Sequence, residues 1–283
     1  MQEEVPISVL NVRKYTTDYM KQRPIITFLS DFGTRDGYAG AVKGVLKIYS
    51  DEIEVIDITH EIESFNIKQA AFTILNYYNQ YPKGTVHLAV VDPEVGSERK
   101  VLIIQTENYH LVGPDNGIFN YLMQRDTFKI YKVDPDSIYD HQQGATFHAR
   151  DIFAPVAARL ALGERPEHIG IPMDTINAAD HRKPITAKDL RQIEVDVIGY
   201  DKFGNIIFDY SKFDLHSVMN HRVNTVRFKN FESNQIYDYY SQVAKKSPIF
   251  LWNSLGFLEL AIFKGSARDY YGLDITDKGT IIF

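Results

Sequence analysis

The sequence predicts an α/β domain with a mostly parallel central sheet flanked by helices, followed by an all-β domain. From Pro24 onward, short apolar runs rich in β-branched residues alternate with segments of helical periodicity, as expected for a parallel sheet covered on both faces. After Gly163–Lys188, a connector that contains proline and many charges, the helical pattern largely disappears. We therefore expect an N-terminal extension over residues 1–23, the α/β domain over 24–185 and the β domain over 186–283.

The elements of the first domain follow from the spacing of apolar residues. Strands are expected at residues 25–29, 53–59, 85–91, 101–105 and 128–133, and helices at residues 38–49, 66–81 and 152–162. The segment His110–Gly117 contains glycine, proline and asparagine and predicts a cluster of turns. Asp151 is a good N-cap for the last helix, and Gly163 follows its end.

The second domain reads as strands separated by short polar loops. Strands are expected at residues 192–200, 206–210, 223–228, 248–252 and 258–263, with a final hairpin at 277–279. Asp201–Asn205 forms the turn between the first two strands, and Asn253–Gly256 is a polar loop between two later ones. These alternating strands and turns predict an all-β domain.

Composition excludes several classes of protein. With 283 residues, 44% hydrophobic and 24% charged, the chain suits a soluble globular protein. Its net charge is −6, and no basic run is long enough to follow a phosphate backbone, so we expect no nucleic-acid partner. The absence of cysteine excludes disulfides and thiol catalysis. No apolar stretch approaches the roughly 20 residues that span a bilayer, so we expect a cytoplasmic protein without membrane contact.

A carboxylate and a guanidinium follow the strand at residues 85–91. Asp92-Pro93 ends this strand because proline lacks the backbone N–H that a sheet ladder needs. In open α/β sheets ligands bind beyond the carboxyl ends of strands, and Arg99 is near enough along the chain to fold back toward Asp92. Two interpretations remain open here: a surface ion pair that braces a turn, or a catalytic carboxylate.

A histidine precedes the predicted helix at residues 152–162. His148 and Arg150 lie just before its N-terminus, where free amides and the helix dipole favour an anion.

The sequence does not contain two common motifs, the dinucleotide-binding fingerprint and the H-E-x-x-H zinc motif. The glycines between residues 33 and 44 do not fit G-x-G-x-x-G, and Ser64 stands where a zinc motif beginning at His60 needs its second histidine.

Seven motifs occur in one order along the chain. They are S-D-F-G-T-x-D at 30–36, D-I-T-H-E-I at 57–62, V-D-P-x-V-G-x-x-R at 91–99, P-D-N-G at 114–117, T-F-H-x-R-D-I-F-A-P at 146–155, D-x-F-G-N at 201–205 and N-S-x-G-x-L-E-L-A at 253–261. In this respect the chain resembles the S-adenosylmethionine hydroxide adenosyltransferases, relatives of the fluorinase and chlorinase enzymes. The resemblance covers about residues 24–283. It implies an α/β domain and a β-barrel-like C-terminal domain, in agreement with the change in periodicity.

The resemblance implies that water displaces methionine from the ribose 5′ carbon of S-adenosylmethionine, with adenosine as the other product. It implies no cofactor and no metal, and it places a hydrolytic triad on Asp92, Arg99 and His148. A sulfonium leaves as a neutral thioether, so the catalytic problem is an aligned, deprotonated nucleophile. Asp92 would accept a proton from water or hold that water in line, and the other two would position it. Which group takes the proton remains open.

The same resemblance implies a set of substrate-binding residues. Asp31 would bind the ribose hydroxyls, Phe65 would lie against the sugar, and Phe203 and Asn205 would face the adenine. The methionine end is assigned to Asp201, Ser254 and Glu259, with Asp36 as a supporting candidate. Taken one at a time, most of these residues also suit turn-capping or core roles.

The resemblance also implies a homotrimer, in which the N-terminal domain of one subunit and the C-terminal domain of its neighbour form each site. Three alternatives to the hydrolase remain: a halogenase using chloride or fluoride, a non-catalytic adenosine or S-adenosylmethionine sensor, and a metal-dependent hydrolase using His60 and His148. A carboxylate at Asp92 would repel a halide, which favours water. The chain departs from the family pattern at Glu94, where glycine is common, and at Phe208-Asp209, where T-N is common.

Overall fold

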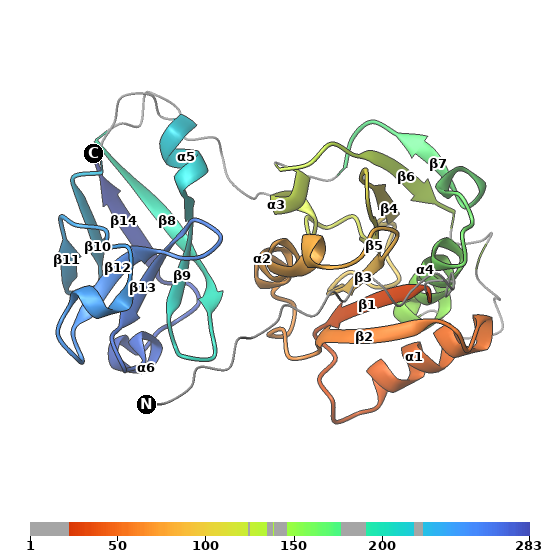
Figure 1. The fold of residues 1–283 in the computed structure, drawn as a ribbon, viewed down its shortest axis with the longest axis horizontal. Coiled ribbons are helices and arrows are strands. Elements are labelled where there is room, and N and C mark those ends of the chain that lie inside the picture. The colour runs from red at the N-terminus through yellow and green to blue at the C-terminus, as the bar shows by residue number, and fades with distance from the viewer. Residues whose placement is uncertain (1–22, 124, 135–137, 139–145, 177–190, 218–222) are drawn as a thin grey trace, which may run out of the picture.

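The computed structural model describes residues 23–123, 125–134, 138, 146–176, 191–217 and 223–283. Within them the chain forms two domains, each built on a seven-stranded sheet, and Figure 1 shows the domains side by side. The predicted N-terminal extension lies outside these ranges except for Arg23.

The N-terminal domain has a mixed sheet with the strand order β2-β1-β3-β5-β4-β6-β7. The strands are β1 (Ile25–Ser30), β2 (Glu54–Thr59), β3 (Val86–Val90), β4 (Val101–Gln105), β5 (His110–Pro114), β6 (Lys129–Val133) and β7 (Gly170–Met173). The neighbours from β2 to β5 pair in parallel, whereas β4 pairs antiparallel with β5 and β6, and β6 with β7. The prediction of a mostly parallel sheet is therefore wrong.

The short connection between β4 and β5 explains this mixed pairing. It spans only residues 106–109, and Thr106 Oγ1 accepts a hydrogen bond from the backbone N–H of Tyr109 at 3.0 Å. A parallel connection needs a crossover of about a dozen residues or more, so this turn forces the two strands to run antiparallel.

Helices cover both faces of the N-terminal sheet (Figure 1). The helices are α1 (Tyr38–Tyr49), α2 (Ile67–Tyr77), α3 (Asn120–Met123) and α4 (Ala154–Ala161), with 3₁₀ turns η2 (Tyr78–Gln80) and η5 (Pro166–His168). α1 and α4 share one apolar layer, while α2 and α3 share the other. Phe257 of the second domain joins the α2–α3 layer, so this layer also holds the domains together.

Strand β5 replaces most of the turn cluster predicted at His110–Gly117. A side chain at Gly113 would bring its Cβ within 2.5 Å of the carbonyl oxygen of Ala89. Glycine here therefore allows close approach between two strands. Only residues 115–117 of this segment lie in a turn, which continues to residue 119 before α3 begins.

The helix after His148 begins differently from the prediction. Residues Ala149–Phe153 form a π-helical turn, η4, that runs directly into α4. Asp151 is therefore not its N-cap: it lies inside the π turn, where its carboxylate accepts two hydrogen bonds from Arg150. Gly163 follows the helix with φ 93°, as its predicted role requires. π turns occur often at functional sites.

The C-terminal domain is an antiparallel sheet with the strand order β11-β10-β14-β8-β9-β13-β12. Its strands are β8 (Gln192–Tyr200), β9 (Ile206–Ser211), β10 (Thr225–Phe228), β11 (Phe231–Ser233), β12 (Pro248–Trp252), β13 (Phe257–Ile262) and β14 (Lys278–Ile282). The ring of Phe231 on one edge strand stacks on Phe250 of the other, with centroids 5.1 Å apart. The sheet is thus nearly closed, which confirms the barrel-like prediction.

Several short elements differ from the prediction. The domain contains two helices, α5 (Lys212–Ser217) and α6 (Ala267–Tyr271), and a 3₁₀ turn, η7 (Tyr240–Gln242). Residues 277–279 do not form a hairpin, because β14 begins at Lys278 and pairs with β8 and β10. Phe208, one of the departures from the family pattern, is fully buried and contacts the rings of Phe228 and Phe250. This departure fills the barrel core.

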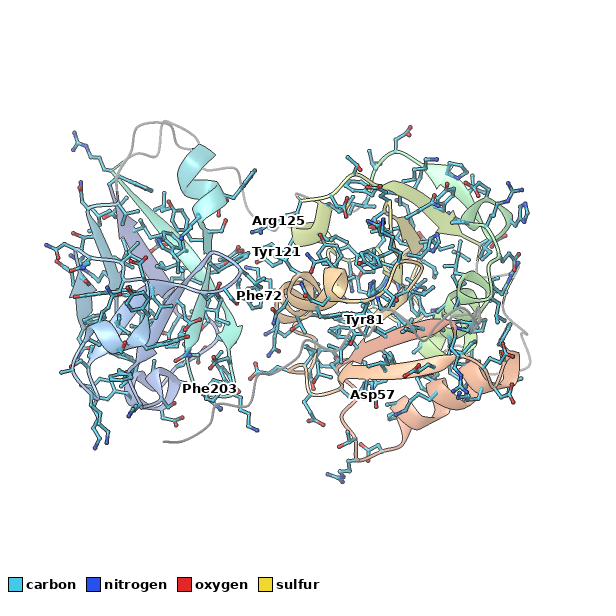
Figure 2. The ribbon with its side chains drawn as sticks, viewed as in Figure 1. Asp57, Phe72, Tyr81, Tyr121, Arg125 and Phe203 are labelled. Carbon is cyan, nitrogen blue, oxygen red and sulfur yellow. The ribbon has the colours of Figure 1, made fainter. Side chains whose placement is uncertain are left out.

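Side chains of α2 and α3 connect the two domains. Phe72 and Tyr121 pack edge-on against Phe257 with ring centroids 5.1 and 5.5 Å away, and Figure 2 shows both pointing toward the C-terminal domain. Tyr200 donates a hydrogen bond across the interface to Glu63 at 2.7 Å. Among the helices that the structure describes, none combines the length and the apolar character needed to cross a membrane.

Candidate active site

Asp92 and Arg99 form a buried ion pair at the carboxyl end of β3. Arg99 Nε donates to both carboxylate oxygens of Asp92, at 3.0 and 2.9 Å, and Arg99 Nη2 also donates to Oδ2. Only 3% of the Arg99 side chain and 5% of the Asp92 side chain are exposed. The pair is therefore not the exposed turn brace that the sequence left open, and burial makes the geometry of both groups rigid.

Arg99 also contacts His148, which fixes the tautomer of the imidazole. Arg99 Nη2 lies 2.8 Å from His148 Nδ1. A guanidinium can only donate, so Nδ1 accepts and the proton of the neutral ring lies on Nε2. The three residues predicted as a triad are thus a continuous chain in which one arginine holds a carboxylate and an imidazole at once.

Two further elements hold this chain in place. The guanidinium carbon of Arg99 lies 5.1 Å from the ring centroid of Phe153, which belongs to the π turn η4. Asn116 donates from its side-chain amide to the carbonyl of Val91 at 2.8 Å, and the N–H of Asp115 donates to the carbonyl of Lys100 at 3.0 Å. The turn after β5 therefore binds both ends of the loop that carries Asp92 and Arg99.

Asn116 was not among the predicted site residues. Its motif, P-D-N-G, was one of the seven in the sequence, and an asparagine in that turn was the signal that could have indicated a supporting role. The structure shows this side chain buried. Glu94, the departure beside Asp92, lies in the same loop with its side chain exposed.

Asp31 lies at the end of β1, next to β3 in the sheet. Its Oδ2 accepts a hydrogen bond from the backbone N–H of Phe65 at 2.9 Å. Burial raises the pKa of Asp31, and the negative charge of nearby Asp92 raises it further. The hydrogen bond from the Phe65 N–H lowers the pKa but does not cancel these effects. The two carboxylates therefore lie close enough to interact.

Phe65 has an unusual conformation and an unusual exposure. Its φ is 67°, in the left-handed region that non-glycine residues rarely adopt, and 68% of the residue is exposed. Backbone strain of this kind concentrates at functional sites. Asp36 lies apart, on an exposed loop where its nearest ionic partner is Arg35 at 3.6 Å.

The D-x-F-G-N turn between β8 and β9 is organised by Asp201. One carboxylate oxygen accepts from the N–H groups of Phe203 and Asn205, and the other accepts from the Asn205 side chain, each at 2.9 Å. This arrangement leaves Phe203 74% exposed, at the edge of the C-terminal domain (Figure 2). A large aromatic side chain and a fixed amide are thus presented next to each other.

A partly buried polar network continues from this turn. Asn205 Nδ2 lies 3.5 Å from the Tyr240 hydroxyl, which donates to Glu259 Oε1 at 2.7 Å. Burial raises the pKa of Glu259 to about 7; the charge of Asp201 adds to this effect and the Tyr240 hydroxyl opposes it. Tyr240 was not predicted, because the polar stretch around it has no strand or helix periodicity.

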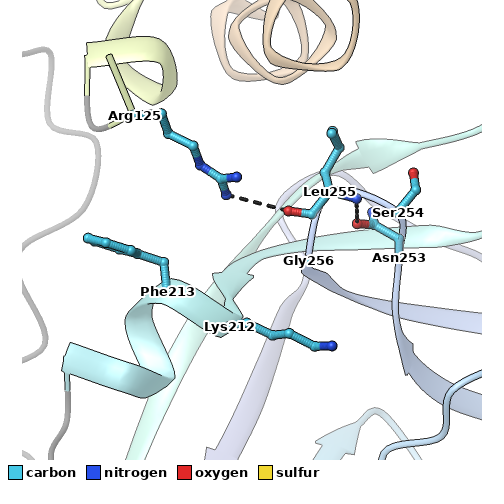
Figure 3. A pocket seen from close by; sticks show the side chains of 7 residues that line it. All are labelled: Arg125, Lys212, Phe213, Asn253, Ser254, Leu255 and Gly256. Carbon is cyan, nitrogen blue, oxygen red and sulfur yellow. Dashed lines mark hydrogen bonds between the residues drawn. The ribbon is translucent and has the colours of Figure 1, made fainter. Parts of the chain in front are cut away.

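Ser254 lies on the loop between β12 and β13, where it lines two cavities. One, of about 470 Å³, is also lined by Asp201, Tyr240 and Glu259 of the C-terminal domain and by Phe72 of α2. Figure 3 shows the other, of about 640 Å³, which is lined by Arg125, Lys212, Phe213 and residues 253–256. The first cavity is acidic and aromatic, while the second is basic.

The predicted residues therefore come together in two groups, one on each domain. Asp31, Phe65 and the Asp92–Arg99–His148 chain form the first group. Asp201, Phe203, Asn205, Ser254 and Glu259 form the second, with Tyr240. In the described part of the chain, no three His, Asp or Glu side chains come together as ligands for a metal ion.

Comparison with known protein families identifies the family of this chain. The model of the SAM hydroxide adenosyltransferase N-terminal domain matches residues 26–170, and that of the SAM hydroxide adenosyltransferase C-terminal domain matches residues 195–280. The chain belongs to the SAM hydroxide adenosyltransferase family.

Individual relatives agree with this family. An (R)-S-adenosyl-L-methionine hydrolase from Methanocaldococcus jannaschii is 35% identical over an alignment of 271 residues, which covers 92% of this chain and 96% of the relative. A fluorinase from Actinopolyspora mzabensis is more distant, at 24% identity over 52% of this chain and 58% of its own. The crystal structure of an uncharacterized conserved protein from Thermotoga maritima superposes with a TM-score of 0.78 at 30% identity and covers 91% of this chain and all (100%) of its own.

We predict that Glu259→Gln stabilises this adenosyltransferase-family protein at alkaline pH but not at acidic pH. Because the folded-state pKa is raised from 4.5 to about 7, the native state holds its proton more tightly than the unfolded state. This contribution to stability is complete below about pH 4.5 and is lost as the pH rises through about 7, a change of about 3 kcal/mol at most. Glutamine stays neutral throughout.

Thermal unfolding of wild type and variant at pH 5 and pH 8 checks this. The melting temperature of the variant should exceed that of wild type by several degrees at pH 8 and by little at pH 5. Glu194→Gln, at a side chain that is 69% exposed, is the matched control and should show no such dependence. Equal differences for Glu259→Gln at both pH values would contradict the prediction.

Proposed function

We propose that this protein hydrolyses S-adenosyl-L-methionine to adenosine and L-methionine. The observation that carries the proposal is the buried chain of Asp92, Arg99 and His148 at the end of β3, beside Asp31, in a chain that is 35% identical to an (R)-S-adenosyl-L-methionine hydrolase. The oxygen of water bonds to ribose C5′ while the C5′–S bond breaks. The electron pair of the broken C5′–S bond stays on sulfur, which leaves as a neutral thioether. No acid is therefore needed at the leaving group.

Asp92 is the group that takes the proton of the attacking water. A carboxylate offers about four lone-pair positions, so the contacts from Arg99 leave room for a water molecule. His148 cannot accept through Nδ1, which faces Arg99, or through the protonated Nε2. Its role is to donate from Nε2 and orient the water, while the arginine fixes both partners.

The remaining residues divide the substrate between them. Asp31 accepts hydrogen bonds from the ribose hydroxyls, and Phe65 covers the sugar. Phe203 and Asn205 bind the adenine, which suits the exposed ring of Phe203 and the fixed side-chain amide of Asn205. The acidic cavity around Asp201, Ser254 and Glu259 suits the ammonium of the methionine end. Asp36 lies outside this cavity, on an exposed loop of the N-terminal domain, and remains a supporting candidate.

Each complete site forms between two subunits of a homotrimer. The support is that the two groups of residues are complementary halves, and that Phe65 and Phe203 expose large apolar surfaces that a ligand and a second domain would cover. The N-terminal group of one subunit supplies the water-handling residues and the ribose contact. The C-terminal group of its neighbour supplies the adenine and methionine contacts.

We predict that Asp92→Asn lowers kcat by about 10³-fold and His148→Ala by about 10²-fold, with the dissociation constant for S-adenosylmethionine changed less than about threefold. An amide cannot take the proton, and loss of the imidazole releases the water. Chromatography of the nucleoside product in the presence of chloride measures turnover, and wild type should form adenosine only. Glu94→Gln, an exposed change in the same loop, is the control and should keep wild-type kcat.

Wild-type turnover in Asp92→Asn would remove the proposed chemistry from this site. A chlorinated nucleoside from the wild type would favour a halogenase instead.

We also predict that two inactive variants complement each other. Asp92→Asn damages only the N-terminal half of a site and Asn205→Ala only the C-terminal half. Co-expressed at equal levels, they should recover about a quarter of wild-type activity, because that share of inter-subunit sites would combine two intact halves. Asp92→Asn with Arg99→Ala, two lesions in the same half, is the control and should recover none. No recovery from the first pair would place the whole site within one subunit.

A further inference from the structure

His60 is a buried histidine that the proposed reaction does not use. It follows β2, which pairs in parallel with β1, and the register of this pair shifts between Phe28 and Leu29, just before Asp31. Only 5% of His60 is exposed, and its ring packs edge-on against Phe28 with centroids 4.7 Å apart. Irregular pairing of strands is common beside active sites. The imidazole therefore lies directly under the loop that presents Asp31.

The contacts of the His60 ring indicate which of its nitrogens carries the proton. Its Nδ1 lies 2.8 Å from the hydroxyl of Ser30, and its Nε2 lies 3.2 Å from Asp57 Oδ1. The Nε2–Asp57 contact does not have the angle of a hydrogen bond, but the nearby negative charge favours the ring proton on Nε2, so Nδ1 accepts from the Ser30 hydroxyl. Asp57 in turn accepts from Lys43 Nζ of α1 at 2.9 Å. Figure 2 shows Asp57 on the N-terminal domain, away from the interface.

The charge of Asp57 supports the assignment of the His60 ring proton to Nε2. Burial acts against its ionisation, but the Lys43 ammonium and the His60 ring outweigh burial and lower the pKa of the carboxyl. Asp57 is therefore an anion at neutral pH.

His60 also fixes the backbone on both sides of Asp31. Ser30 Oγ accepts from the N–H of Phe32 at 3.3 Å, so the residues before and after Asp31 are tied together. The carbonyl of His60 itself accepts from the N–H of Gly33 at 2.7 Å. Gly33 has φ 64°, which glycine adopts without strain, so the loop can turn back onto His60. One residue thus holds the loop through its ring and through its main chain.

We propose that His60 is a positioning residue for Asp31, through a relay that runs from Lys43 and Asp57 to Ser30 and orients the carboxylate toward the ribose. This inference rests on the ribose role proposed above for Asp31. The relay contributes to binding of the 2′ and 3′ hydroxyls and does not touch the attacking water. Its loss should therefore raise KM much more than it lowers kcat.

The chain offers a matched control in His87. It is fully buried in the same sheet, and its Nδ1 lies 2.8 Å from the hydroxyl of Thr27, three residues before Ser30 on β1. Burial lowers the pKa of His87 to about 3, so its ring is neutral. Replacement of either histidine by phenylalanine removes a ring-to-hydroxyl contact from β1, but only His60 is linked to the Asp31 loop.

Titration calorimetry with adenosine and with 2′,3′-dideoxyadenosine tests the proposal without requiring turnover. Wild type should prefer adenosine by roughly tenfold to a hundredfold, the effect of hydrogen bonds to a carboxylate. His60→Phe should reduce this preference to below about threefold, as Asp31→Asn should, and Ser30→Ala, a smaller change in volume, should reduce it in part. His87→Phe should lower the melting temperature but keep the preference.

Each outcome decides the proposal. An unchanged preference in both His60→Phe and Ser30→Ala would overturn it, and so would an equal loss in His87→Phe, which would indicate general loosening. A wild type with no preference would overturn it together with the role of Asp31. A wild type that prefers adenosine, loses the preference in His60→Phe and forms no adenosine from S-adenosylmethionine would support the relay and refute the hydrolase function.

Discussion

The site depends on a single guanidinium that is shared by two partners. Arg99 binds Asp92 from the end of a strand and His148 from the start of a π turn, and so sets the position of one and the tautomer of the other. Both members of the ion pair are almost fully buried, so loss of either leaves a buried charge without a partner, at a cost of about 3–5 kcal/mol. The same contact therefore stabilises the loop and fixes the positions of the Asp92 and His148 side chains.

The mixed sheet is what makes this contact possible. β3 and β5 run in the same direction, so Asp92 and the turn with Asn116 lie at one edge of the sheet. β4 runs the opposite way and begins at that edge, which brings Arg99 back beside the end of β3. Asn116 and Asp115 then hold the two ends of the intervening loop. A purely parallel sheet would have sent β4 away from the carboxylate.

Local sequence predicted much of this arrangement but not its long-range parts. The bounds of α1 follow from its apolar spacing, and the place of Asp92 follows from the proline that ends β3. The antiparallel return of β4 depends on pairing between distant segments, which periodicity does not report. Asn116, Tyr240 and the relay through His60 were missed for a related reason: each acts through a contact with a residue far away in the sequence. The motifs located Asn116 and His60 without giving their partners, whereas Tyr240 lies outside all seven motifs.

The most direct test of the account is the fate of the water oxygen. The reaction should be run in water enriched in oxygen-18, and the nucleoside and amino acid products analysed by mass spectrometry. Attack at ribose C5′ predicts one heavy oxygen in the 5′-hydroxyl of adenosine and none in methionine. A labelled amino acid, or 5′-methylthioadenosine as the nucleoside product, would show that water attacks a different carbon and would contradict the role given to Asp92, Arg99 and His148.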